Sequence, residues 1–149
     1  MRRPLATVAV LLATGLPLLT GACTDRGGSP AGVRESCQEY TRLLNDWSAA
    51  YGAELGAVGQ ASAAGDHGRR DTAVPVVREL FLTTADGLAE QAGRTPDREL
   101  AEALTEAAAG LREIAGQIET YRDVAGAPAL MSDGRFAEAG ERVSASCAG

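Results

Sequence analysis

The sequence predicts an all-α protein, built as an up-down-up-down four-helix bundle with one disulfide. Over most of the 149 residues, apolar side chains recur at spacings of three and four, which is typical of amphipathic helices. Short breaks rich in glycine, proline or polar residues divide the pattern into four stretches, and four helices joined by short loops favour antiparallel packing. Two cysteines, Cys37 and Cys147, lie near the two ends of the predicted domain.

The first predicted helix runs from about residue 34 to residue 64. A polar, glycine-containing stretch at 65–70 ends it. Its apolar stripe consists of Cys37, Tyr40, Leu44, Trp47, Tyr51, Leu55 and Val58.

The second predicted helix begins near Asp71 or Thr72, either of which can act as its N-cap. Pro75 then falls in the first turn, where the missing backbone N–H is tolerated, and Gly93 ends the helix. Its buried stripe consists of Val74, Val77, Phe81 and Leu88.

The third predicted helix has Thr95 as its N-cap and Pro96 as its first residue, and it is expected to continue to Ala125. Its apolar residues alternate at spacings of four and three, which indicates heptad packing within a bundle. They are Leu100, Leu104, Ala107, Leu111, Ile114, Ile118, Tyr121 and Ala125.

A break at residues 126–128, Gly-Ala-Pro, is expected to separate the third helix from a fourth. Ser132 or Asp133 caps this last helix. One of its faces carries Phe136, Ala139 or Gly140, Val143 and Cys147.

The antiparallel topology brings the start of the first helix and the end of the fourth to the same end of the bundle. Cys37 and Cys147 therefore meet there, each in phase with the apolar stripe of its own helix. An even pair of cysteines in an exported protein is typical of a disulfide. The loops at 65–71 and 126–132 are expected at the opposite end, where a partner would have access to them.

The N-terminal segment has the features of a secretory signal. Arg2 and Arg3 supply positive charge, and the apolar run from Leu5 to Leu19 is too short and too interrupted to span a membrane as a stable helix. The run ends in Leu-Leu-Thr-Gly-Ala at residues 18–22, directly before Cys23. This stretch resembles the lipobox of bacterial lipoproteins, although Thr20 stands where leucine is most usual.

The resemblance implies that the thiol of Cys23 receives a diacylglyceryl group and that residues 1–22 are then removed. Two acyl chains are sufficient for stable anchoring. The expected organisation is a removed signal peptide (1–22), a flexible tether (23–33) and a bundle domain (34–149) at the outer face of the cell membrane. A secreted protein with an unmodified Cys23 and an uncleaved anchor are the alternatives.

Composition excludes several classes of function. Loss of Arg2 and Arg3 with the signal peptide lowers the basic count from 14 to 12 against 20 acidic residues, so the formal net charge becomes −8. This charge argues against nucleic-acid binding and against adhesion to anionic lipid headgroups. The chain contains no lysine, which excludes Schiff-base chemistry and a P-loop lysine.

No motif indicates catalysis, a metal or a cofactor. His67 is the single histidine and lies in a polar turn between Asp66 and Gly68, where a solvated side chain is expected. It has no partner ligands at helical spacing. The sequence therefore predicts a protein that is not an enzyme and that needs no cofactor.

Two groups on the first helix are candidates for a ligand or partner surface. Tyr40, Trp47 and Tyr51 share one stripe, and core packing or an aromatic-lined pocket would both explain it. Small residues flank that stripe, and close packing of a neighbouring helix is the favoured interpretation, with a partner-binding groove or hinge and compositional drift as alternatives. They are Gly52, Gly56, Gly59 and Ala63.

The overall pattern is similar to the small exported helical lipoproteins of actinobacteria, a resemblance that carries no catalytic residues with it. The expected function is a membrane-anchored, non-enzymatic module that binds another envelope protein. The alternative is a carrier or sensor of a small apolar ligand held between the helices. A cavity near Trp47 would favour the carrier, whereas a filled core with an exposed small-residue groove would favour the module.

Overall fold

The computed structural model describes residues 30–66 and 68–148. The predicted signal peptide, Cys23, most of the predicted tether and His67 lie outside these residues. The described chain forms five α-helices: α1 (Pro30–Ala63), α2 (Arg69–Arg94), α3 (Arg98–Gln117), α4 (Tyr121–Met131) and α5 (Gly134–Cys147).

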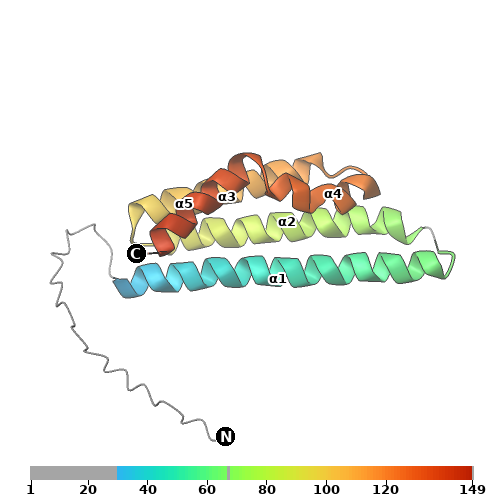
Figure 1. Ribbon diagram of the computed structural model, residues 1–149, viewed down its shortest axis with the longest axis horizontal. Helices are drawn as coiled ribbons and strands as arrows, with labels where there is room; N and C mark the ends of the chain where they lie inside the picture. The colour runs from blue at the N-terminus through green and yellow to red at the C-terminus, as the bar shows by residue number, and fades with distance from the viewer. Residues whose placement is uncertain (1–29, 67, 149) are drawn as a thin grey trace, which may run out of the picture.

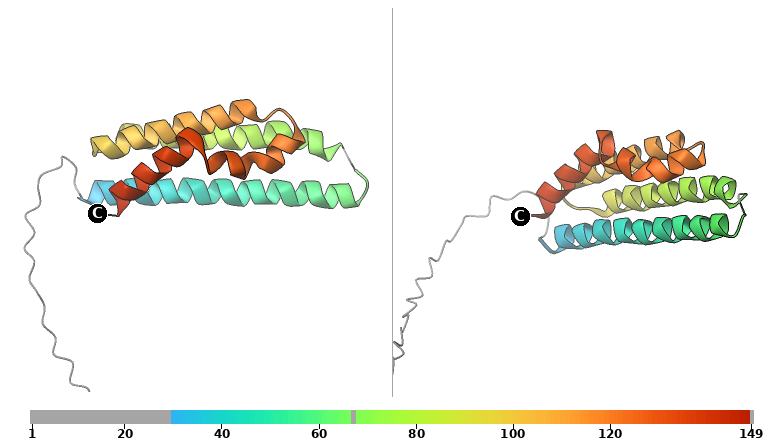
Figure 2. Two further views of the ribbon diagram at one scale, coloured as in Figure 1. Left: turned by 45° about the horizontal axis from the view of Figure 1, so that its top comes forward. Right: turned by 45° about the vertical axis from the view of Figure 1, so that its right-hand side comes forward.

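The predicted all-helical four-helix packing is confirmed, with one change: two consecutive short helices, α4 and α5, form the fourth arm of the bundle. α2 runs antiparallel to α1, α3 runs antiparallel to α2, and α4 and α5 return one after the other along the bundle (Figure 1). We call the end where α1 begins and α5 finishes the disulfide end, and the opposite end the far end. The other views show the same order of arms (Figure 2).

The predicted extent of the third helix is wrong. α3 stops at Gln117, because Ile118 adopts an extended backbone while its side chain stays fully buried. Thr120 then caps α4: its side chain accepts from the backbone of Asp123, whose carboxylate accepts from the Thr120 N–H at 2.8 Å. Val124 is also buried, so the apolar pattern continues across this break and does not reveal it.

The predicted break at 126–128 is also wrong, because Pro128 lies inside α4. In a regular helix the carbonyl of Val124 would accept from the N–H of residue 128, which proline lacks. The hydroxyl of Tyr51 on α1 donates to this carbonyl instead, at 2.6 Å. The expected 126–132 loop is therefore mostly helix, and the short α4–α5 connection lies part-way along the bundle and not at its far end (Figure 1).

Three predicted helix starts are displaced. α3 is capped by Asp97, whose side chain accepts from the Leu100 N–H at 2.8 Å, and not by Thr95, whose hydroxyl donates back to the Gln91 carbonyl. α2 begins at Arg69, before the predicted caps Asp71 and Thr72, where an ion pair of 2.6 Å joins Arg69 Nη2 to Glu54 Oε2 on α1. The predicted Asp133 cap of α5 is confirmed, since its side chain accepts from the Gly134 N–H.

The third displaced start is that of α1, which begins at Pro30, inside the predicted tether. Val33 packs against the hydrophobic core, and Gly32 lies against the α2–α3 turn. A Cβ at Gly32 would lie 2.9 Å from Cγ of Pro96. These contacts order a turn of helix that the polar composition of the segment does not predict.

The core is aliphatic and rich in alanine, and α2 and α3 together supply five of its six fully buried leucine, isoleucine and phenylalanine side chains. Gly110 lets α3 and α5 approach closely, since a Cβ there would lie 2.7 Å from the backbone nitrogen of Phe136. Fully buried leucine, isoleucine and phenylalanine residues are Phe81, Leu88, Leu100, Leu104, Leu111 and Ile118.

The predicted disulfide is confirmed. Cys37 in α1 and Cys147 at the end of α5 are bonded, with their Cα atoms 5.8 Å apart and a sequence separation of 110. The bond joins the first and last helices at the disulfide end. Across the described residues, we find no helix with the length and apolarity needed to cross a membrane.

Candidate functional site

The aromatic residues of α1 pack in the core. Trp47 and Tyr51 are buried and stacked, with ring centroids 5.0 Å apart, and Phe81 of α2 meets Trp47 edge-on at 5.1 Å. Tyr40 is half-buried, and its hydroxyl would lie 3.3 Å from a Cβ placed at Gly140. The three rings of Trp47, Tyr51 and Phe81 occupy the space in which an apolar ligand would have to lie.

Burial raises the pKa of the Tyr40 phenol. Burial, followed by the nearby Tyr121, raises the pKa of the Tyr51 phenol as well. Both groups therefore stay neutral around pH 7, and Tyr51 keeps the proton that it donates to Val124. The indole N–H of Trp47 is buried without a hydrogen-bond partner among the described residues.

The favoured interpretation of the small residues on α1 is wrong. A Cβ built at Gly52, Gly56 or Gly59 would have nothing within 4 Å, so no neighbouring helix packs closely against them. They belong to an exposed, uncharged strip, which we call the small-residue face. Its members are Asn45, Ala49, Gly52, Gly56, Gly59 and Ala63.

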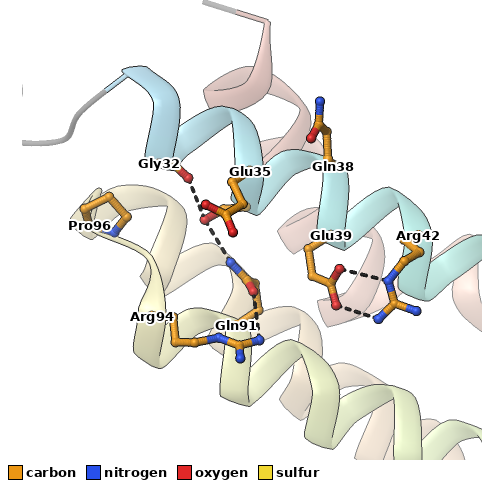
Figure 3. Close-up of a pocket in the computed structure, with 9 residues that line it drawn as sticks. Gly32, Glu35, Gln38, Glu39, Arg42, Gln91, Arg94 and Pro96 are labelled. Atoms are coloured by element: carbon orange, nitrogen blue, oxygen red, sulfur yellow. Dashed lines mark hydrogen bonds and ion pairs between the residues drawn. The ribbon is translucent and has the colours of Figure 1, made fainter.

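A polar groove lies at the disulfide end, between the first turns of α1 and the last turns of α2 (Figure 3). Its volume is about 500 Å³, in the range of small-molecule sites. It is not among the sites that the sequence predicted. It is lined by Gly32, Glu35, Ser36, Gln38, Glu39, Arg42, Gln91, Arg94 and Pro96.

The floor of this groove is a buried hydrogen-bond network. Ser36 is 1% exposed and Gln91 6% exposed, and Nε2 of Gln91 donates to Oγ of Ser36 at 2.9 Å. Oγ of Ser36 lies 3.0 Å from both the Gly32 carbonyl and Oγ1 of Thr95, and Oγ1 of Thr95 lies 2.8 Å from the Gln91 carbonyl. The hydroxyls of Ser36 and Thr95 have one proton each for the three contacts that they make with the two carbonyls and with each other. The protons of this network can therefore be arranged in more than one way.

The rim of the groove carries opposite charges. Arg42 donates to Glu39 at 2.8 Å and to Asp46 at 2.6 Å, and the hydrogen bond from Arg42 lowers the pKa of the Glu39 carboxyl. Arg94 donates to Glu90 at 3.0 Å and to Oε1 of Gln91 at 3.2 Å. Glu35 has no hydrogen-bond or ion-pair partner among the described residues.

A second depression, of about 350 Å³, lies between α3 and the α4–α5 connection. Arg135 borders it and donates to Glu106 and Glu113 of α3, at 2.6 Å each. These bonds raise the pKa of Arg135 and lower that of Glu106. The charged groups here are paired with each other across α3 and α5, and the depression has no buried polar floor like that of the groove.

The hydroxyl of Ser36 has neutral hydrogen-bond partners, namely a carbonyl, a hydroxyl and an amide, so no base among the described residues contacts it. Among the described residues, no group of histidine, cysteine or acidic side chains is arranged to hold a metal ion.

One signal in the sequence could have located the groove. Gln91 lies three residues after Leu88, in phase with the buried stripe of its helix, and a polar residue at a buried position needs partners. The partners of the Gln91 side chain are Arg94, in the same helix, and Ser36, which lies on α1 and is 55 residues away in sequence. No family model, curated protein or solved structure matches the chain.

Proposed function

We propose that this protein is a cell-envelope lipoprotein, anchored through a diacylglyceryl group on Cys23 at the extracytoplasmic face of the membrane. Its helical domain acts as a non-enzymatic module that binds another envelope protein. The Gly-Ala-Cys sequence at 21–23 supports the anchor. The Cys37–Cys147 disulfide supports an oxidising, exported compartment.

The exposed small-residue face of α1 is the observation that carries the binding role. α1 has 34 residues, which corresponds to a length of about 51 Å. Glu54 is the one charged residue between Trp47 and Ala63, and it pairs with Arg69 of α2. In a strongly acidic protein, this leaves a long uncharged strip on which the backbone of a partner helix could approach closely.

The glycines of this face are costly for the isolated helix. Each interior glycine destabilises a helix by about 0.5–1 kcal/mol relative to alanine, and no contact with the other described residues compensates for Gly52, Gly56 or Gly59. A partner that packs directly on the α1 backbone would explain why small residues occupy these positions.

The packing of the protein interior gives less support to the alternative, a carrier of a small apolar ligand. The stacked Trp47 and Tyr51 rings, with Phe81 against them, would have to separate to admit a ligand. The hydrogen bond from Tyr51 to Val124 would break in the same movement.

Site-specific photo-crosslinking in intact cells tests the proposal. A photoreactive side chain at Asn45 or Gln60, both exposed beside the glycines, should give one discrete crosslinked protein. The same side chain at exposed Thr105 of α3 is the matched control and should not give this product. Gly56→Leu should abolish the product, and the fold should tolerate this change because the space beside Gly56 is open.

Equal crosslinking from Thr105, or an unchanged product with Gly56→Leu, would contradict the proposal. Native mass spectrometry of the protein purified from membranes adds a test of the alternative. A small molecule retained by the wild type and lost by a Trp47→Ala variant would support the carrier.

A further inference from the structure

We propose that the polar groove at the disulfide end binds the headgroup of a zwitterionic phospholipid, through a primary ammonium group and the adjacent phosphate. The groove is a recess of about 500 Å³ with a buried polar floor and a rim of both charges. Its position relative to the membrane rests on the function proposed above.

The groove has one negative and one positive group available to a ligand. Arg42 is occupied by Glu39 and Asp46. Glu35 is without a partner among the described residues, and Arg94 uses two of its five N–H donors, on Glu90 and Gln91. Figure 3 shows Glu35 on the α1 side of the groove and Arg94 on the α2 side.

This pair of charges selects a ligand that carries both. A simple anion would meet the carboxylates of Glu35 and Glu39, and a simple cation would meet Arg94. A phosphate bound by Arg94, with an ammonium group bound by Glu35, satisfies both sides at once. Charge-assisted hydrogen bonds of this kind are about twice as strong as neutral ones.

The floor provides a further donor for the phosphate. The side chain of Gln91 is held at both ends, since Nε2 donates to Ser36 and Oε1 accepts from Arg94. Nε2 carries a second N–H, and Gln91 lines the groove. An oxygen of the phosphate that contacts Arg94 can accept this second hydrogen.

The lining favours a primary ammonium group over a quaternary one. Quaternary ammonium groups are recognised by aromatic rings, and none of the nine residues that line the groove is aromatic. A primary ammonium group donates hydrogen bonds, and the free carboxylate of Glu35 accepts them. The chemistry therefore fits phosphoethanolamine better than phosphocholine.

The position of the groove favours a lipid as the source of this headgroup. Gly32 lines the groove two residues after the start of α1. Pro30 is seven positions after Cys23, a distance of at most about 25 Å for a fully extended chain, so an anchored domain keeps the groove within reach of the membrane surface. The acidic domain is repelled by anionic headgroups, and a zwitterionic headgroup avoids that repulsion.

Calorimetric titration of the full lipidated protein, purified in detergent, tests the recognition directly. O-phosphoethanolamine should bind saturably, and phosphocholine, ethanolamine and inorganic phosphate should each bind at least about tenfold more weakly. Glu35→Gln and Arg94→Gln should each weaken the binding of phosphoethanolamine by about tenfold or more. Arg98→Gln is the matched control and should have no effect, because Arg98 is 93% exposed and pairs with Glu102.

Equal binding of phosphoethanolamine and phosphocholine, or wild-type affinity in both groove variants, would overturn the proposal. The free headgroup does not require an anchored protein, so failure here is distinguishable from failure of the proposed function. Amide exchange in vesicles tests the lipid source. Residues 32–42 and 91–96 should exchange more slowly in phosphatidylethanolamine than in phosphatidylcholine vesicles, and equal rates would overturn the assignment to a lipid.

Discussion

The hydroxyl of Tyr51 takes the place of a backbone donor that α4 lacks. Its bond of 2.6 Å to the Val124 carbonyl compensates for the missing N–H of Pro128 and ties α4 to α1. Tyr51→Phe should lower the free energy of unfolding by about 1–3 kcal/mol, because it leaves a buried carbonyl without a partner. Urea denaturation followed by circular dichroism measures this change.

A double-mutant cycle makes that prediction specific. In a Pro128→Ala background, residue 128 has an N–H, so the cost of Tyr51→Phe should fall by about 1 kcal/mol. Tyr40→Phe is the control and should cost less than Tyr51→Phe, because Tyr40 is half-buried. Identical costs of Tyr51→Phe in both backgrounds would refute the role assigned to this hydroxyl.

Glycines on different helices should respond oppositely to the same substitution. Gly52→Ala, Gly56→Ala and Gly59→Ala should each raise the free energy of unfolding by about 0.5–1 kcal/mol, since the added methyl meets open space. Gly110→Ala should lower it by about 1–3 kcal/mol, because the Cβ would collide with the backbone of Phe136. Thermal melts compare the four variants, and destabilisation by Gly56→Ala would show that this face is packed after all.

At the scale of the helices, much of the fold can be predicted because it depends on local patterns. The stripe through Leu100, Leu104 and Leu111 identifies α3, and Phe136 and Val143 identify α5. The end of α3 cannot be predicted from the stripe, since Ile118 and Val124 are buried on both sides of the turn. The Thr120–Asp123 capping box marks the break, but its signal is weaker than the apolar periodicity.

Helix α4 should depend on pH through its capping box. Hydrogen bonds from the Thr120 hydroxyl, and then from the backbone N–H groups of Thr120 and Glu119, lower the pKa of the Asp123 carboxyl below 3.8. A lowered folded-state pKa stabilises the protein above the unfolded value, and this contribution is lost as pH falls through the folded value. Asp123→Ala should therefore lower the midpoint of thermal unfolding at neutral pH.

The difference between wild type and Asp123→Ala should be constant well above pH 3.8 and should shrink below it. Thermal melts across a pH series measure this difference. A difference that persists unchanged to the lowest pH would contradict the role of the ionised carboxylate.

The exposed side of α1 and the residues that pair across the polar groove could not be predicted, for a common reason. Whether Gly52 and Gly56 face a neighbour depends on where the other arms lie around α1, and the sequence of one helix does not contain that information. In the groove, Ser36 contacts Thr95, which is 59 residues away in sequence. Thr95 lies in the turn between α2 and α3, where the N-cap of α3 is Asp97 and not the predicted Thr95. Sequence periodicity predicts which face is buried but not what covers the faces beside it.

On the scale of the whole molecule, one covalent bond joins the first and last helices. The disulfide closes a loop of 110 residues, which stabilises the fold by roughly 5 kcal/mol in the chain-entropy model. A Cys37→Ser, Cys147→Ser double variant should lose about this amount in guanidinium denaturation. A reducing agent should destabilise the wild type similarly and leave the double variant unchanged, and equal stability of all forms would rule out a structural role for the bond.

The proposed anchoring assigns different tasks to different parts of the bundle. With that anchor, the disulfide end and its polar groove would face the membrane, while the small-residue face runs along α1 toward the far end. A partner protein and a lipid headgroup could then be bound at the same time. The orientation of the domain toward the membrane depends on a lipid at Cys23, which would fix the distance between the domain and the membrane.

Fractionation of cells that express wild type and Cys23→Ala, together with intact mass measurement, tests that anchor most directly. The wild type should be found in the membrane fraction, with a mass that corresponds to residues 23–149 plus a diacylglyceryl modification. Cys23→Ala should lose that modification and leave the membrane fraction. A wild type that carries no lipid mass, with a Cys23→Ala variant retained equally in the membrane fraction, would contradict the lipoprotein assignment.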